Sequence, residues 1–214
     1  KLLPMFYLAH DYPKRLQRWI ACLWTAATAA GAVSLLLNVR AGVLAGLILL
    51  AAALLLYNLH VNQIRAHRHK PNPGVGIRWA VGAARAAFAG CVAAALAYGI
   101  GAGALPSSAF TVALWFYLYG WVALTILGYM SKIVPFLWWT HKYGPLVGKQ
   151  KVPTMAQLLK ERPLHLLLGA LSAAPMLLLI GIGAGAGSLT AIAGCGLSVS
   201  ALAYIGCIAR VFTK

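Results

Sequence analysis

The chain has 214 residues, of which 62% are hydrophobic and 9% are charged, and its mean hydropathy is +0.81. These values lie far outside the range of soluble globular domains and indicate an integral membrane protein. The formal net charge of +16 does not indicate a nucleic-acid-binding protein, because the basic residues cluster in short segments between apolar runs. We therefore expect the lipid bilayer to be its main partner, with no nucleic acid bound.

The apolar stretches predict an all-α fold that crosses the membrane. Each stretch approaches the roughly 20 residues that a helix needs to span the hydrocarbon. The predicted spans are 16–37, 42–61, 79–100, 109–140, 164–182 and 189–209. The fourth is unusually long and contains Pro135 near its end, where we expect either a kink or a turn that emerges at the interface.

Basic residues occur in alternate connections between these spans. The four basic segments hold Lys14, Arg15 and Arg18; Arg65, Arg68, Lys70 and Arg78; Lys142, Lys149, Lys151, Lys160 and Arg162; and Arg210 and Lys214. The intervening connections hold Arg40 alone or no charge. The excess of Lys and Arg predicts a multi-pass membrane protein with the basic loops and the C-terminal end on the inner, cytoplasmic side.

One phrase occurs twice in the chain, at an offset of 131 residues. Residues 1–13 read KLLPMFYLAHDYP and residues 132–144 read KIVPFLWWTHKYG, with lysine, proline, histidine and tyrosine coinciding. Both copies end a predicted helix that runs inward, with three spans between them. This spacing predicts a repeat of four helices in the same orientation.

The repeat also suggests how the chain is organised. We expect residues 1–131 and 132–214 to form two parts of one continuous helical bundle. Lys132 lies deep in an apolar stretch, so Lys1 should lie equally deep in a helix whose first part precedes this sequence. The chain is therefore expected to hold six complete spans and the end of a preceding one, as the C-terminal part of a longer protein.

The connection after the second phrase contains a helix-start signal. Thr154 is followed three residues later by Gln157, the spacing of a capping box. This pair predicts a short helix, whose Leu158 and Leu159 we expect to lie on the membrane surface.

The histidines are the side chains best suited to hold a heme or a metal. His60 is the strongest candidate, because it lies within an apolar run close to Asn58 and Asn62. His10 and His141 are weaker candidates at matching helix ends, where the alternative is an interfacial cap on helix carbonyls. The other histidines are expected in the basic loop or at the interface: His67, His69 and His165.

Arg85 is the second candidate for binding a cofactor. It follows Arg78 by two turns on the same face of the third span, among small residues. A charge within the membrane indicates a functional site, here by pairing with a carboxylate such as a heme propionate. The alternative is an arginine that extends to the inner surface, and Lys132 has the same alternative to a role in a polar pathway.

Catalytic chemistry is not predicted. The four cysteines lie in apolar spans without CxxC spacing, and we expect them to be small buried hydrophobes without a disulfide or metal site. The only acids are Asp11 and Glu161, both in inner loops, so the predicted spans hold none of the carboxylates that proton pumps use. No nucleotide-binding, zinc-protease or serine-nucleophile motif occurs, and no catalytic residue is assigned.

The segment Gly120–Arg162, together with the first thirteen residues, resembles bacterial membrane proteins related to heme-copper oxidase subunit I. The resemblance implies a protein of the bacterial inner membrane with same-orientation sets of four helices, heme as cofactor and electron transfer with a redox partner. It also implies histidines ahead of the GW pair, but the stretch there reads ALWFYLYGW. Either most heme ligands lie upstream of this sequence, or the protein has lost the metal chemistry, and a copper centre is not supported.

Two functions are consistent with these features. The first is an oxidase-like, heme-associated membrane subunit in which His60 or Arg85 assists. The alternative is a non-catalytic anchor that holds other membrane subunits through its small-residue faces and basic inner surface. A permease built from parallel repeats is a third, weaker interpretation.

Overall fold

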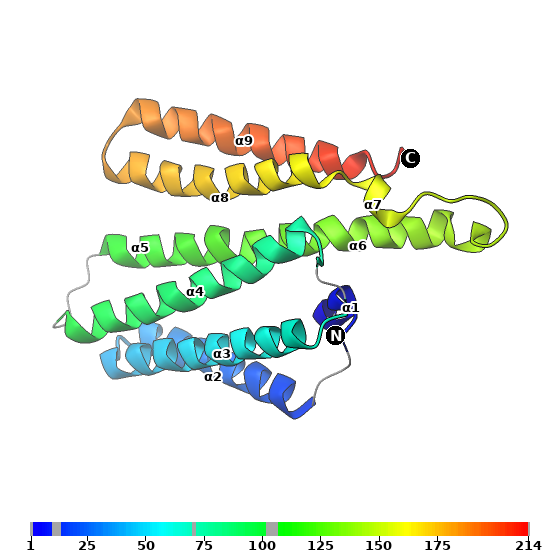
Figure 1. The fold of residues 1–214 in the computed structure, drawn as a ribbon. Coiled ribbons are helices and arrows are strands. Elements are labelled where there is room, and N and C mark those ends of the chain that lie inside the picture. The colour runs from blue at the N-terminus through cyan, green and yellow to red at the C-terminus, as the bar shows by residue number, and fades with distance from the viewer. Residues whose placement is uncertain (1, 10–13, 70–71, 102–106, 214) are drawn as a thin grey trace. The chain divides into compact units, whose positions relative to one another are not determined.

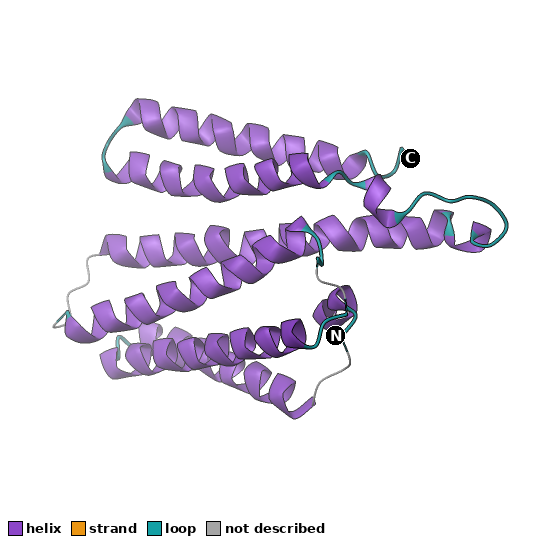
Figure 2. Cartoon of the chain, in the orientation of Figure 1, coloured by secondary structure: helices purple, strands orange, loops and turns teal. Residues whose placement is uncertain are grey.

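A computed structural model describes residues 2–9, 14–69, 72–101 and 107–213 as a series of helices (Figure 1). The elements are α1 (Leu2–Tyr7), α2 (Lys14–Leu36), α3 (Arg40–Ala66), α4 (Val75–Ile100), α5 (Ser107–Trp115), a π-helix (Phe116–Ala123), α6 (Leu124–Lys142), a 3-10 turn (Gly144–Leu146), α7 (Met155–Leu158), α8 (Glu161–Gly183) and α9 (Gly187–Ala209). Figure 2 shows no strand in these described segments. The predicted all-α class is confirmed.

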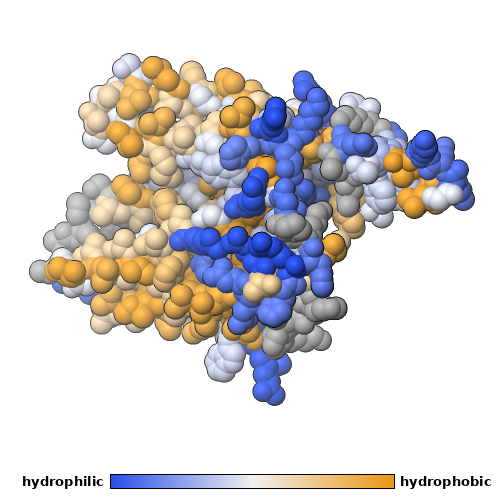
Figure 3. Space-filling model, viewed as in Figure 1, coloured by the Kyte–Doolittle hydropathy of each residue, from blue (hydrophilic) through white to orange (hydrophobic). Residues whose placement is uncertain are grey.

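Six of the helical segments are long and apolar enough to cross a membrane, as predicted. They are Arg15–Leu36, Arg40–Ala66, Val75–Ile100, Thr111–Lys142, Glu161–Gly183 and Gly187–Ala209. Hydrophobic residues cover much of the visible surface of the long helices (Figure 3). Because lipid tails are as apolar as a protein core, such side chains are compatible with exposure in a bilayer.

The long fourth span is a continuous helix made of three segments. It begins as α5, widens into the π-helix and continues as α6. Pro135 is buried inside α6, which runs on to Lys142. Of the two alternatives predicted at Pro135, the emerging interfacial turn therefore does not form.

The chain divides into two compact units. Unit 1 comprises Lys1–Pro73 and Val81–Trp121, and unit 2 comprises Gly74–Ala80 and Val122–Lys214. Unit 1 contains the paired helices α2 and α3, and unit 2 contains the paired helices α8 and α9. The four-helix repeat and the single continuous bundle stay predictions.

The turns of both helix pairs use the same backbone device. Asn38, with φ +55°, follows α2, and Gly185, with φ +64°, follows α8. The next residue then donates its N–H back across the turn, from Val39 to the Ser34 carbonyl at 2.8 Å and from Ala186 to the Gly181 carbonyl at 2.9 Å. These bonds satisfy carbonyls at the helix ends and reverse the chain, which allows each pair to pack side by side.

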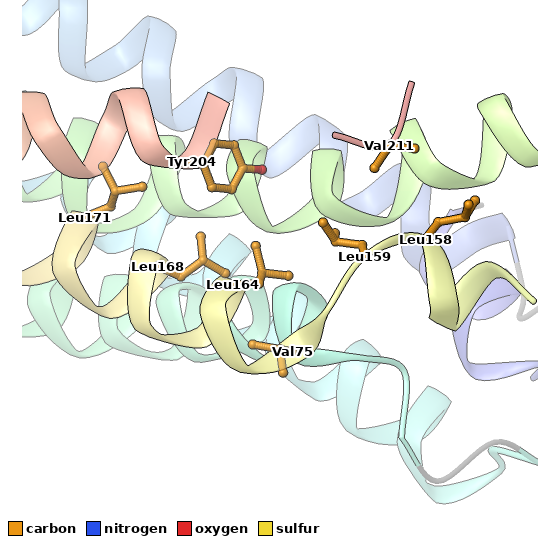
Figure 4. Close-up of a cluster of buried hydrophobic side chains, with 8 residues drawn as sticks. All are labelled: Val75, Leu158, Leu159, Leu164, Leu168, Leu171, Tyr204 and Val211. Atoms are coloured by element: carbon orange, nitrogen blue, oxygen red, sulfur yellow. The ribbon is translucent and has the colours of Figure 1, made fainter. Parts of the chain in front are cut away.

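The core of unit 2 gathers side chains from several helices (Figure 4). Its buried members are Val75, Leu158, Leu159, Leu164, Leu168, Leu171, Tyr204 and Val211. The short helix predicted from the capping box is confirmed as α7, where the Thr154 N–H donates to Gln157 Oε1 at 2.9 Å. The expected place of its leucines is wrong, because Leu158 and Leu159 are only 3% and 9% exposed. They belong to the core beside α8 and α9 instead of lying on the membrane surface.

The core of unit 1 is smaller and includes one of the four cysteines. Cys91 is buried with Leu54 and Ala87, and its Sγ lies 3.4 Å from the Leu47 carbonyl oxygen. The prediction of burial is wrong for Cys22 and Cys195, which are exposed. In a membrane protein, hydrophobic character does not separate core from lipid-facing positions, because both are apolar.

Candidate functional site

Two asparagines of α3 face α4 within unit 1. Asn58 and Asn62 are four residues apart and therefore share one face of α3. Asn58 is buried, and its Nδ2 donates to the Leu54 carbonyl at 2.9 Å and to the Ala84 carbonyl of α4 at 3.2 Å. Arg85 Nη2 donates to Asn62 Oδ1 at 2.9 Å. The two asparagines thus join α3 to α4 by side-chain hydrogen bonds.

The guanidinium of Arg85 is directed toward the end of α3. Arg85 lies ten residues after Val75, roughly 15 Å along the axis of α4. Its partner Asn62 lies only four residues before the end of α3 at Ala66. Both side chains are exposed, Asn62 is a neutral amide, and within the described part of the chain no carboxylate is paired with the arginine. An exposed guanidinium with further N–H donors is suited to bind an anion.

His60 lies on a different side of α3 from this pair. It is two residues from both Asn58 and Asn62, which in an α-helix is a rotation of about 200°. Its side chain is only 6% exposed. His60 and Arg85 are thus both in unit 1, but they face opposite sides of α3 and do not form one site. Whether either binds a cofactor stays a prediction.

The two weaker histidine candidates are not joined to this region. His10 lies outside the described residues. His141 is exposed in the last turn of α6, in unit 2, with its ring centroid 6.4 Å from that of Trp138. The cap at the end of α3 involves His67 of the basic loop, whose Nδ1 lies 3.1 Å from the Gln63 carbonyl oxygen.

Unit 2 contains a basic residue whose partner was not predicted. Lys132 Nζ of α6 lies 3.8 Å from Glu161 Oε1, at the start of α8. Gly74 packs against the same lysine with φ +104°, and a side chain there would collide with the end of Lys132. A signal was present in the sequence, since Glu161 is one of only two acids in the chain. The pairing itself needs the fold, because 29 residues separate the two side chains.

Two further hydrogen bonds in unit 2 carry no sequence signal. Trp79 Nε1 donates to His165 Nδ1 at 2.9 Å, and the Tyr204 hydroxyl donates to the Leu127 carbonyl at 2.6 Å. His165 was expected to be interfacial, and here it accepts a hydrogen bond between α4 and α8. These polar side chains connect helices within the unit.

No group of three or more His, Cys, Asp or Glu side chains that could hold a metal ion occurs among the described residues. Comparison with protein-family models, with curated proteins and with solved structures finds no match to the chain.

Proposed function

We propose that this chain is a structural subunit of a bacterial inner-membrane complex, which it anchors and helps to assemble. The observation that carries the proposal is the use of polar side chains within the long helices. In unit 1, Asn58 and Arg85 bond across α3 and α4, and in unit 2, Trp79 and Tyr204 bond across neighbouring helices. Hydrogen bonds between helices help to hold a membrane bundle together, so these polar side chains are assigned structural roles and not chemical ones.

The proposal predicts that the chain is found in an assembly larger than itself. Native electrophoresis of mildly solubilised membranes, followed by immunodetection of a tagged chain, measures this directly. We expect a discrete species well above the 22.6 kDa of the chain with its detergent micelle. A tagged chain that migrates only as a free monomer, in membranes from its own organism, would contradict the anchoring role.

The proposed orientation places the basic loops and the C-terminal end in the cytoplasm, following the charge asymmetry of the loops. A fluorescent protein fused after Arg210 should fold and fluoresce, whereas a periplasmic alkaline phosphatase fused there should be inactive. The opposite pattern would reverse the orientation.

A second candidate function is heme-associated electron transfer. It is supported by the resemblance of Gly120–Arg162 to oxidase subunit I-like proteins and by the burial of His60 in a long helix. A neutral, buried imidazole is suited to axial ligation of heme. Full-length protein purified from heme-supplemented cells should then show a Soret band that His60→Ala weakens and His67→Ala leaves unchanged. A colourless full-length protein would exclude this function while leaving the anchoring role untouched.

A further inference from the structure

We infer that Arg85 and Asn62 form a binding site for the phosphate of an anionic membrane lipid on the surface of unit 1. The 2.9 Å bond from Arg85 Nη2 to Asn62 Oδ1 fixes the guanidinium while it uses only part of the donor capacity. Because Asn62 is neutral, the positive charge remains available. A phosphate diester offers an anion with several acceptors, which is the partner that a guanidinium binds best.

The two helices that carry the site are joined just beyond it. Asn58, one turn from Asn62, bonds to the carbonyl of Ala84, the residue before Arg85. This second bond limits the sliding of α3 against α4 at the level of the site. The donor group is therefore ordered before a lipid arrives, which lowers the entropic cost of binding.

There is open space beside the guanidinium. Gly82 precedes Arg85 by three residues and is its neighbour on the surface of α4. A Cβ built on Gly82 would meet no atom of the described structure within 4 Å. Ala86 and Ala89 continue this exposed face of α4 with short side chains. The headgroup thus has room next to the arginine, and an acyl chain has a shallow path along α4.

The neighbouring face of α3 has the apolar character that an acyl chain requires. Leu59 is 47% exposed and Leu55 is 42% exposed, three and seven residues before Asn62. Residues at these spacings lie on the same side of a helix. The polar pair thus stands at one end of an exposed apolar strip, the arrangement expected for a bound phospholipid.

The position along the helices agrees with the level of lipid phosphates. Asn62 lies one turn before the end of α3, and Arg65 and Arg68 follow within six residues. Juxtamembrane basic residues attract anionic headgroups to the surface. A carboxylate on a partner helix would also neutralise Arg85, but exposed leucines flanking a site at headgroup level favour the lipid.

Native mass spectrometry of the purified full chain tests the site, with phosphatidylglycerol as the anionic probe and phosphatidylcholine as the zwitterionic one. Loss of one charged hydrogen bond should weaken phosphatidylglycerol binding by about tenfold in Arg85→Gln. The bond from Asn58 to the Ala84 carbonyl does not involve the Arg85 side chain and still joins α3 to α4 in this variant. Arg40→Gln is the matched control, since Arg40 of α3 lies 6.0 Å from the Tyr98 ring of α4, at the other end of the same two helices. We expect Arg40→Gln to retain wild-type binding.

A second variant keeps the charge and fills the space. Gly82→Leu should fold normally, because its side chain enters open space, but it should weaken phosphatidylglycerol binding about as much as Arg85→Gln. The proposal is overturned if both variants bind this lipid as the wild type does. It is also overturned if inorganic phosphate at millimolar concentration displaces the lipid, which would indicate a site for soluble phosphate. Loss of a co-purifying membrane protein in Arg85→Gln with lipid binding unchanged would instead assign the arginine to a partner helix.

Discussion

Each unit of this protein contains a basic residue inside a long helix, and the two side chains have different partners. In unit 2, Lys132 is paired with the carboxylate of Glu161 at 3.8 Å and packed against Gly74. In unit 1, Arg85 is held by the neutral amide of Asn62 and stays exposed. The same kind of charge is thus compensated within the protein in one case and left for an external anion in the other. A basic residue in a membrane helix does not by itself reveal which role it has.

The glycines beside these residues differ in the same way. In unit 2, α4 begins against α6 so closely that a side chain on Gly128 would collide with the carbonyl oxygen of Gly76. In unit 1, Gly82 faces open space. Close backbone approach is a feature of stable contacts between membrane helices, whereas an open glycine leaves room for another molecule.

The largest expected effect is that of Gly128→Leu, which would force the backbones of α4 and α6 apart. We expect a loss of about 3 kcal/mol in the free energy of unfolding, the upper end for overpacking a tight contact. Reversible unfolding in mixed micelles, followed by circular dichroism, measures it. Gly82→Leu is the control and should leave stability near wild type. Equal destabilisation by both variants would show that the two glycines are equivalent.

A smaller effect is expected from breaking the ion pair of unit 2. Glu161→Gln should lower stability by about 1 kcal/mol, because the pair is partly exposed and its charges are screened. Arg85→Gln should change stability less, since Arg85 and Asn62 are both exposed and the pair carries no ionic attraction. The same unfolding assay compares the two. If Arg85→Gln proves the more destabilising, the bond from Arg85 to Asn62 contributes more to stability than the ion pair of unit 2, and the contrast between the units fails.

The smallest effect is expected from Asn58→Leu. The two carbonyls that Asn58 contacts belong to helices and need no second donor, so replacement by a similar-sized apolar side chain should change stability by less than about 1 kcal/mol. This variant should nevertheless loosen α3 against α4 and increase hydrogen exchange of the amides around Ala84. Unchanged exchange would mean that apolar packing alone holds the two helices in place.

The long helices were predictable from sequence because a bilayer imposes a simple length and hydropathy requirement. The capping box at Thr154 and Gln157 also predicted α7 correctly, since the signal is local. The burial of Leu158 and Leu159 could not be predicted, because the lipid and the protein core are both favourable environments for an apolar side chain near a membrane. Whether leucine meets lipid or another leucine depends on which helix lies beside it.

The candidate site was predictable only in part. The position of Arg85 among small residues indicated a functional side chain. The two asparagines are also visible in the sequence, two residues before and after His60. Which asparagine meets the arginine depends on how α3 and α4 face each other, and this depends on side-chain packing along both helices. The pairs Lys132–Glu161 and Trp79–His165 join residues 29 and 86 positions apart, beyond the reach of any local pattern.

The π-helix at Phe116–Ala123 changes the directions in which side chains leave the fourth span. Each π turn contains about one residue more than an α turn, so the regular 3.6-residue period of side-chain directions is interrupted at these residues. The aromatic pairs Trp115–Tyr119 and Tyr117–Trp121, with ring centroids 4.5 Å and 5.2 Å apart, lie within or at the edge of this change of phase. A single helical wheel drawn through the whole fourth span therefore does not describe which of its residues share a face.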